Sequence, residues 1–298
     1  MIPILIVCYL RPEKLRVLLE SLINSKTEIF VFIDRAEAAH KNLNSEVYEI
    51  AMQYTNIMNL KVEWSSEKLG VAQGVPAALN WAFTYVEELI ILEDDCFPTK
   101  YAFEYFENQR DRIKNSIVMS CATSPWKNQP TQHQMNSVAL SNYPLIWGWS
   151  TNKSNWKKIS RLINSPTPHG RVLSSIIRNP SKALAICFFY AAVIRVNRSK
   201  LAAWDCPVAL EMLLSNYKSI ISDVTLIENS GNDEMGSHPG ESVSKDSQVI
   251  SASSERAANT RFDSSSSALS INNREIEKEI YRMKTRHYLS PLKALINL

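Results

Sequence analysis

The sequence predicts an α/β fold in which helices cover both faces of a mostly parallel sheet. Strand-like and helix-like segments alternate over the first 125 residues, an order that favours a parallel sheet. Several strand-like segments are continuous apolar runs, as expected for strands buried on both faces. The composition, with 45% hydrophobic and 21% charged residues, is that of a globular protein with a sizeable core.

The elements of this first part follow in regular order. The expected strands cover residues 3–9, 28–34, 61–64 and 88–93. The expected helices lie near residues 12–23, 42–56 and 75–86, and a fourth begins near residue 101. In the first helix, leucines and an isoleucine recur at three- and four-residue spacing, which indicates one apolar stripe facing the sheet.

The pattern after residue 117 is less regular. We expect strands near residues 117–122 and 219–227, and helices near residues 153–163, 171–177, 181–195 and 205–217. Residues 237–270 are rich in serine and poor in large apolar groups, which predicts a flexible loop. Helical periodicity returns near residues 274–287. The expected divisions of the chain are therefore 1–125, 126–236, 237–270 and 271–298.

Several functional classes are excluded by simple counts. The formal charge of +3 gives no electrostatic argument for nucleic acid. The seven glycines are placed so that neither a dinucleotide fingerprint nor a P-loop can be written. The five cysteines form no CxxC pair, which favours reduced thiols in the cytoplasm. No segment has the features of a signal peptide or the length of a membrane span.

Three consecutive acids, Glu93, Asp94 and Asp95, follow a buried strand. Open α/β sheets bind their ligands at the carboxyl ends of strands. Adjacent carboxylates repel one another unless a cation is present, and hard oxygen ligands suit Mg²⁺ or Mn²⁺ held together with substrate phosphates. The triplet thus predicts a metal–diphosphate site, with a solvated acidic turn as the alternative.

Two other strand ends point to the same place. Arg11 ends the first strand and opens a helix, where backbone N–H groups favour anions. Asp34 ends the second strand, where an acid can accept hydrogen bonds from a ribose or a base. Each alone is typical of an ordinary surface residue, but together with the acidic triplet they indicate a nucleotide-diphosphate pocket.

The segments around these residues resemble GT-A glycosyltransferases. They are the RP and ID pairs that end two strands, LGVAQGVPAALNWAF, and ILEDDCFPTKYAFEYF. Their order is similar to that of N-acetylglucosaminyltransferase I and of bacterial family-2-like transferases that build surface polysaccharides. The resemblance implies a Rossmann-like GT-A fold with a smaller acceptor-side region. Residues 1–125 would be its donor half and residues 126–236 its acceptor half.

The resemblance also implies roles for single residues. Asp95 would bind the metal directly, supported by Asp94 and Glu93, which would contact the ribose or the sugar. The other implied donor-binding residues are Arg11 at the phosphates, Asp34 at the base, and Gly70 and Asn80 beside the sugar.

The second half resembles the same transferases more loosely. IWGWST and the Trp204-Asp205 pair are similar to acceptor-side segments, and ENSGNDEMGSH is similar to a loop that ends in a histidine. Trp147, Trp149 and Trp204 would then contact the acceptor sugar, although Trp147 and Trp149 equally suit a core. His238 would approach the metal or the phosphates, although a lone histidine is more often not a ligand.

The predicted function is a metal-dependent, inverting glycosyltransferase that uses a nucleotide-diphosphate sugar. A UDP-sugar is the favoured donor, Mn²⁺ or Mg²⁺ the cofactor, and a saccharide or lipid-linked oligosaccharide the acceptor. Asp205 is the candidate general base, with a helix N-cap as its alternative role. A sugar-nucleotide pyrophosphorylase is disfavoured, because the glycine-rich basic loop of those enzymes is missing. A non-catalytic nucleotide-sugar binding protein is the third hypothesis.

The C-terminal tail, residues 271–298, alternates basic and apolar residues. Such a segment can lie in the headgroup region of an anionic membrane, which predicts weak peripheral contact at the inner face of the cytoplasmic membrane. A helix packed back on the domain is the alternative.

Overall fold

The computed structural model describes residues 1–99, 101–123, 138–163, 165, 169–199, 203–222, 224–230, 278 and 281–282. Its strands are β1 (Ile4–Cys8), β2 (Ile29–Ile33), β3 (Leu60–Trp64), β4 (Glu88–Glu93), β5 (Cys96–Pro98), β6 (Ile117–Cys121), β7 (Val138–Ser141), β8 (Trp149–Asn152), β9 (Lys218–Ser222) and β10 (Ile227–Asn229). Its α-helices are α1 (Pro12–Ser21), α2 (Lys41–Tyr54), α3 (Val71–Ala82), α4 (Ala102–Gln109), α5 (Lys153–Ile159), α6 (His169–Arg178), α7 (Ala183–Ser199) and α8 (Asp205–Ser215).

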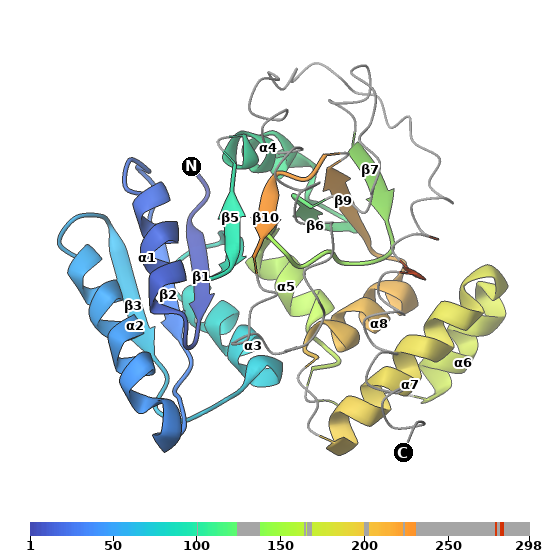
Figure 1. The fold of residues 1–298 in the computed structure, drawn as a ribbon. Coiled ribbons are helices and arrows are strands. Elements are labelled where there is room, and N and C mark those ends of the chain that lie inside the picture. Colours follow the sequence, from blue (N-terminus) through green and yellow to red (C-terminus); the bar gives the residue numbers. More distant parts are fainter. Residues whose placement is uncertain are drawn as a thin grey trace.

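The predicted α/β fold with a mostly parallel sheet is confirmed. An eight-stranded sheet has the order β3-β2-β1-β4-β8-β6-β9-β7, and β10 pairs with β5 in a separate two-stranded sheet (Figure 1). The first four strands of that order are parallel, β6 and β9 are parallel, and β8 and β7 run antiparallel to their neighbours. The carboxyl ends of β1, β2, β3 and β4 therefore share one edge of the sheet.

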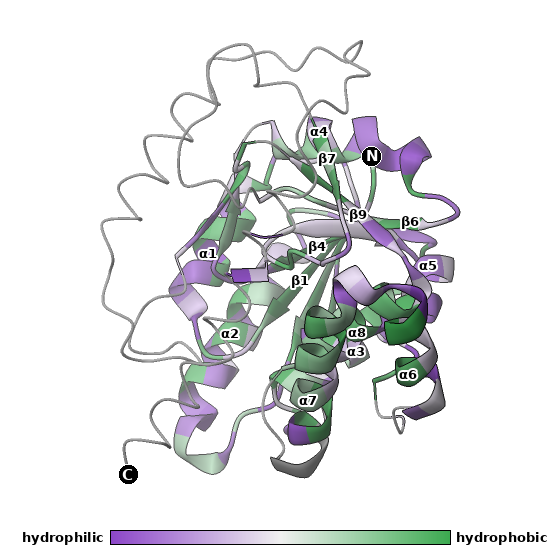
Figure 2. Ribbon diagram, turned by 90° about the vertical axis from the view of Figure 1, so that its right-hand side faces the viewer, coloured by the Kyte–Doolittle hydropathy of each residue, from purple (hydrophilic) through white to green (hydrophobic). Residues whose placement is uncertain are grey.

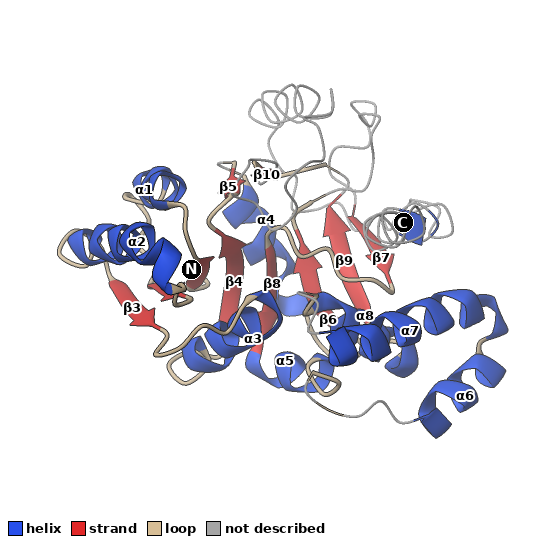
Figure 3. Cartoon of the chain, turned by 60° about the horizontal axis from the view of Figure 1, so that its bottom comes forward, coloured by secondary structure: helices blue, strands red, loops and turns tan. Residues whose placement is uncertain are grey.

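Alternation along the strands builds a core on each face of the sheet. In β1, Leu5 belongs to the core that includes residues of α3, α5, α6, α7 and α8, whereas Ile4 and Ile6 belong to the core that includes residues of α1, α2 and α4. The helices accordingly lie on both sides of the strands (Figure 3). Strands from both parts of the chain, before residue 124 and after residue 137, therefore belong to one eight-stranded sheet.

The start of α3 differs from the expectation. The sequence predicts this helix from about residue 75, yet it begins at Val71, directly after Gly70 with φ +69°. The carboxylate of Asp34 accepts hydrogen bonds from the N–H groups of Leu69 (2.9 Å) and Gly70 (2.8 Å) just before the helix. Those two N–H groups are bonded to the residue after β2, which is 35 and 36 positions away in sequence, so the sequence near the helix does not identify this partner.

Further differences concern short strands. Residues 219–227, expected as one strand, divide into β9 and β10, which belong to different sheets. Strands β5, β7 and β8 are three, four and four residues long and were not predicted. Segments this short give too few positions for an alternating pattern to be recognised.

The predicted serine-rich loop, residues 237–270, lies outside the described residues, as does most of the C-terminal tail. From that tail, Tyr281 is described, and its ring centroid lies 6.0 Å from that of Phe188 in α7 and 6.5 Å from that of Tyr143. At this one position the tail is packed against the domain.

Gly148 makes a close contact between the two sheets. Its φ is +73°, and a Cβ atom there would lie 2.0 Å from Cδ1 of Ile227 and 2.9 Å from its Cγ1. We expect Gly148→Ala to lower the free energy of unfolding by about 2–4 kcal/mol, because it adds backbone strain to overpacking. The matched control is Gly170→Ala in α6, where the added Cβ meets nothing within 4 Å. Urea unfolding of both variants checks this, and equal stabilities would contradict it.

Candidate functional site

The acidic triplet lies at the end of β4, where this strand meets β1. Glu93 is the last residue of the strand, and the N–H of Asp94 donates to the carbonyl of Val7 at 3.1 Å. Asp94 and Asp95 are 5% and 6% exposed. The site therefore holds carboxylates in a position where water offers them little stabilisation.

Arg11 joins the two aspartates. Its Nη1 atom lies 2.9 Å from Oδ1 of Asp94 and 2.8 Å from Oδ2 of Asp95. A single cationic nitrogen is thus shared by two carboxylates from the neighbouring strand end. The structure brings together these three residues, which the sequence placed on separate segments 83 and 84 positions apart.

The environment changes the proton affinity of these acids. Burial, followed by the charges of Asp95 and Asp94, raises the pKa of Glu93 to about 8. Burial also raises the pKa of Asp94 to about 6, although Arg11 opposes the shift. Burial therefore favours the protonated form of Glu93 more strongly than that of Asp94.

Asp205 lies near the same acids. It is the first residue of α8 and is 6% exposed, and its negative charge contributes to the raised pKa of Glu93. The N-cap position of α8 is occupied by Trp204, so Asp205 lies one residue inside the helix rather than at its cap. The structure thus brings an acid from the second half of the chain to the edge formed by the first half.

Asp34 and Gly70 also meet, through the two hydrogen bonds that precede α3. The Asp34 carboxylate lies 3.7 Å from the place where Gly74 would carry a Cβ, so the first turn of α3 passes close to the end of β2. Asn80 lies further along α3, where its Oδ1 accepts a hydrogen bond of 2.8 Å from the indole N–H of Trp156. In this structure Asn80 orients a tryptophan of α5.

The three candidate acceptor-binding tryptophans lie in different environments. Trp149 and Trp204 are 1% and 3% exposed, and their rings stack at a centroid distance of 5.9 Å within the core. Trp147 is 43% exposed. Of the three, Trp147 is the one whose ring is substantially open to solvent in this structure.

Asn44 in α2 was missed by sequence reasoning. Its Nδ2 donates to the carbonyls of Tyr9 (2.8 Å) and Asp34 (2.9 Å), and its Oδ1 accepts from the N–H of Ala36 (3.1 Å) and the indole of Trp64 (3.0 Å). One side-chain amide therefore connects the ends of β1, β2 and β3. No local pattern identifies it, because these partners are 8–35 positions away.

We expect Asn44→Ala to lower the free energy of unfolding by about 2–4 kcal/mol, because it leaves buried donors and acceptors without partners. Asn24→Ala is the control, since Asn24 is exposed in the turn before β2. Chemical denaturation measures both. A loss below about 0.5 kcal/mol for Asn44→Ala, the usual range for surface changes, would contradict this role.

The end of β10 was also missed. The N–H of Ser230 donates to the backbone carbonyl of Asp95 at 2.9 Å, and Nδ2 of Asn229 lies 3.4 Å from Oδ1 of Asp95. Lys14 of α1 donates to the carbonyl of Ser230 at 2.8 Å. These contacts bring the segment after β10 to Asp95. The candidate metal ligand His238 lies outside the described residues.

The carboxylates fit a divalent cation. Within the described residues there is no group of three or more His, Cys, Asp or Glu side chains arranged to hold a metal. Mg²⁺ and Mn²⁺ commonly use one or two carboxylates and complete their shell with phosphates and water, so Asp94 and Asp95 are sufficient protein ligands. Their oxygens already share one positive charge, that of Arg11. Burial, with Asp95 nearby, raises the pKa of Cys96 well above its usual value, which keeps this neighbouring thiol protonated.

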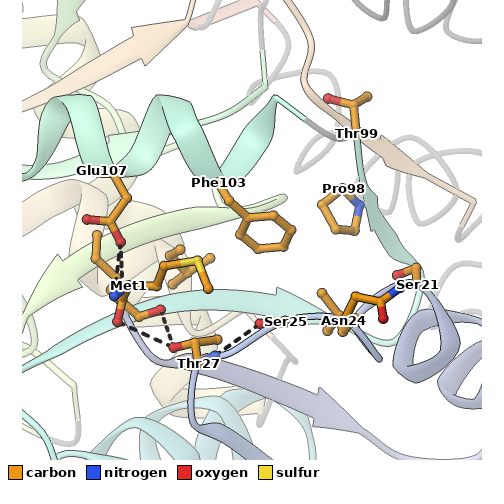
Figure 4. A pocket seen from close by; sticks show the side chains of 12 residues that line it. Met1, Ser21, Asn24, Ser25, Thr27, Pro98, Thr99, Phe103 and Glu107 are labelled. Carbon is orange, nitrogen blue, oxygen red and sulfur yellow. Dashed lines mark hydrogen bonds and ion pairs between the residues drawn. The ribbon is translucent and has the colours of Figure 1, made fainter.

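A cavity of about 370 Å³ lies at the other end of the strands (Figure 4). It is lined by residues near the starts of β1 and β2 and by α4, including Met1, Thr27, Phe103 and Glu107. None of the site residues predicted from the sequence lines it.

Comparisons with known proteins give distant similarities. No protein-family model and no curated protein matches the chain. Among solved structures, residues 1–349 of TarS from S. aureus match at a TM-score of 0.35 and 18% identity, covering 51% of this chain and 47% of that one. This chain therefore spans about half the length of that structure.

Two further solved structures match over more of their length. A mannosyltransferase from Pyrobaculum calidifontis, in complex with GDP-Man and Mn²⁺, has a TM-score of 0.39 and 14% identity and covers 72% of this chain and 73% of its own. A putative glucose-1-phosphate thymidylyltransferase from Bacillus anthracis has a TM-score of 0.40 and 9% identity, with coverages of 88% and 98%. These likenesses are distant, with identities of 9–18%.

Proposed function

We propose that this protein is a metal-dependent glycosyltransferase, which moves a sugar from a nucleotide-diphosphate donor to an acceptor hydroxyl. The observation that carries the proposal is the convergence of Asp94 and Asp95 on one cationic nitrogen of Arg11, at the carboxyl ends of β1 and β4. This edge is where parallel α/β sheets bind nucleotides. A site with two buried carboxylates and one arginine suits a diphosphate that arrives with its own divalent ion.

Charge neutralisation is the first task of such a site. A cation held by Asp95 and Asp94 would supply Lewis-acid stabilisation to the departing diphosphate. Arg11 would turn from the carboxylates to the phosphates, since its guanidinium can then bind oxygens of the leaving group. The N-terminal turn of α3, next to Gly70, offers backbone N–H groups to the same anion.

Proton transfer is the second task. The acceptor hydroxyl becomes more acidic as its oxygen bonds to the sugar, and a carboxylate must then accept its proton. We assign this role to Asp205, which lies near Glu93 at the acidic edge. A base that is separate from the residues that bind the leaving diphosphate supports a single displacement with inversion at the sugar carbon.

Two further observations support an acceptor class and a cellular setting. The exposed ring of Trp147 can stack on the C–H face of a saccharide or lipid-linked saccharide acceptor. All five cysteines are free thiols, which favours the cytoplasm, where surface-polysaccharide precursors are assembled from nucleotide sugars.

A thermal-shift screen tests the proposal. UDP-, GDP- and dTDP-sugars, each with and without Mn²⁺, are compared with a CMP-sugar, which has one phosphate instead of two. We expect one diphosphate donor to stabilise the protein only when Mn²⁺ is present, by about 2.7 kcal/mol at 100 times its dissociation constant. UDP-sugars are the expected donors.

Product analysis separates the alternatives. Release of the nucleoside diphosphate from the stabilising donor supports a glycosyltransferase. Formation of a nucleoside triphosphate from the donor and pyrophosphate would show a pyrophosphorylase instead, and binding without turnover would show a non-catalytic nucleotide-sugar protein. Equal shifts with and without Mn²⁺ would contradict the metal requirement.

A further inference from the structure

The charges of this chain are unevenly distributed along the sequence. Residues 112–204 contain 13 Lys and Arg residues but no Asp or Glu. The rest of the chain contains 20 Lys and Arg residues against 30 acids, so the small overall charge of +3 hides a strongly basic segment. This separation of charge is typical of proteins that contact an anionic surface.

The basic segment includes a helical hairpin formed by α6 and α7, which pack against each other and connect through residues 179–182. The hairpin lies at the outer edge of the molecule, with α6 on the side away from the large sheet (Figures 1 and 3). Figure 2 shows that much of α7 is hydrophobic. On the inner side of the hairpin, Arg171 of α6 forms a bidentate ion pair with the fully buried Glu211 of α8, at 2.7 and 2.9 Å.

The outer side of the hairpin exposes large aliphatic side chains. Leu173 and Ile177, one turn apart on α6, are 61% and 71% exposed, and Leu184 in the first turn of α7 is 80% exposed. Cys187, one turn after Leu184, is exposed as well. Arg178, the residue after Ile177, is exposed as well, and its Nη2 lies 3.4 Å from Oγ of Ser174 and 3.5 Å from Oγ of Ser175. Large exposed apolar residues in a basic segment indicate an interaction surface.

We propose that this outer face of the α6–α7 hairpin docks the protein on an anionic phospholipid surface. Aliphatic side chains would enter the headgroup region while the surrounding cations contact lipid phosphates. A second copy of the chain fits less well, because two acid-free basic faces would repel each other. Nucleic acid would satisfy the cations but would leave the three aliphatic side chains in water.

The docking is peripheral. None of the helices in the described part of the chain has the length and hydrophobicity to span a bilayer. None of the residues of this apolar stripe, Leu173, Ile177 and Leu184, belongs to the nucleotide edge, so the docking does not depend on the proposed reaction.

Cys187 provides a local probe for the test. The other four cysteines are buried, so an environment-sensitive fluorophore can be attached at this position. We expect its emission to shift to the blue and increase with vesicles of phosphatidylcholine and phosphatidylglycerol at 7:3, but not with phosphatidylcholine alone. A probe on Ile57→Cys in a Cys187→Ser background is the control, because Ile57 is exposed and lies outside the basic segment 112–204.

Co-sedimentation with the same vesicles measures the contribution of the apolar stripe. The variant Leu173→Gln/Ile177→Gln/Leu184→Gln should lower the partition coefficient about tenfold or more, since buried apolar area is a main source of interfacial binding. The control Val17→Gln/Ile23→Gln/Ile57→Gln removes three exposed apolar residues elsewhere and should bind like the wild type.

Three outcomes would overturn the proposal. The first is equal binding by the hairpin variant and the wild type. The second is loss of binding only in Lys284→Gln/Arg286→Gln/Lys293→Gln, which would assign the contact to the C-terminal tail. The third is no binding to anionic vesicles together with a dimer that the hairpin variant dissociates, which would show that a second copy covers this face.

Discussion

Asp95→Asn should abolish metal-dependent donor binding and leave the fold intact. Asp95 shares the guanidinium of Arg11 with Asp94 and is the proposed direct ligand of the cation. A neutral amide is a weaker ligand for a hard cation, so the affinity for donor with Mn²⁺ should fall at least about 100-fold, beyond the 10–100-fold typical of supporting residues. Calorimetric titration with donor, in the presence and absence of Mn²⁺, measures the effect.

Asp111→Asn is the matched control for this charge change. Asp111 is an exposed acid after α4, so its replacement should leave donor affinity and thermal stability at the wild-type values. If Asp95→Asn binds the donor and Mn²⁺ as tightly as the wild type, Asp95 is not the ligand. Should it fail to fold, Asp95→Glu keeps the charge and separates loss of structure from loss of binding.

Asp205→Asn should reduce turnover by a factor of about 10²–10⁴ at saturating donor, the usual contribution of a general base. Donor affinity should remain nearly unchanged, because Asp205 belongs to the acceptor side of the proposed reaction. Removing an acid from the first turn of a helix should also lower stability by about 0.3–1 kcal/mol, through the helix dipole. Steady-state kinetics and thermal unfolding together resolve the two effects.

Glu104→Gln is the matched control, since Glu104 is an exposed acid in the first turn of α4. It should show the same small loss of stability with full turnover. A stability loss with normal turnover in Asp205→Asn as well would leave Asp205 with a role only at the helix terminus.

Much of the first half of the fold was predictable from sequence. The strand expected at residues 88–93 has the same bounds in the structure, because an unbroken apolar run between charged residues fits a strand buried on both faces. The position of the acidic triplet at its end followed directly. The second half was less predictable, since antiparallel β7 and β8 are short and their pairing depends on partners far away in sequence.

The contacts inside the site were not predictable, even where the residues were. The ion pairs of Arg11 connect positions more than 80 residues apart, and nothing local marks Asn44 or Asn229. Trp149 was equally suited to a core or to a sugar surface, and the sequence around it is the same in both cases. Its stacking on Trp204 in the core depends on how β8 and α8 approach each other.

The four hydrogen bonds of Asn44 have a consequence for how a ligand enters. They fix the ends of three strands before any nucleotide arrives, so little binding free energy has to be spent on ordering those walls. In the proposed reaction, Arg11 would have to leave its two carboxylates before it could bind phosphates. Cation and diphosphate should therefore bind cooperatively, since a cation held by the aspartates would free Arg11 for the diphosphate.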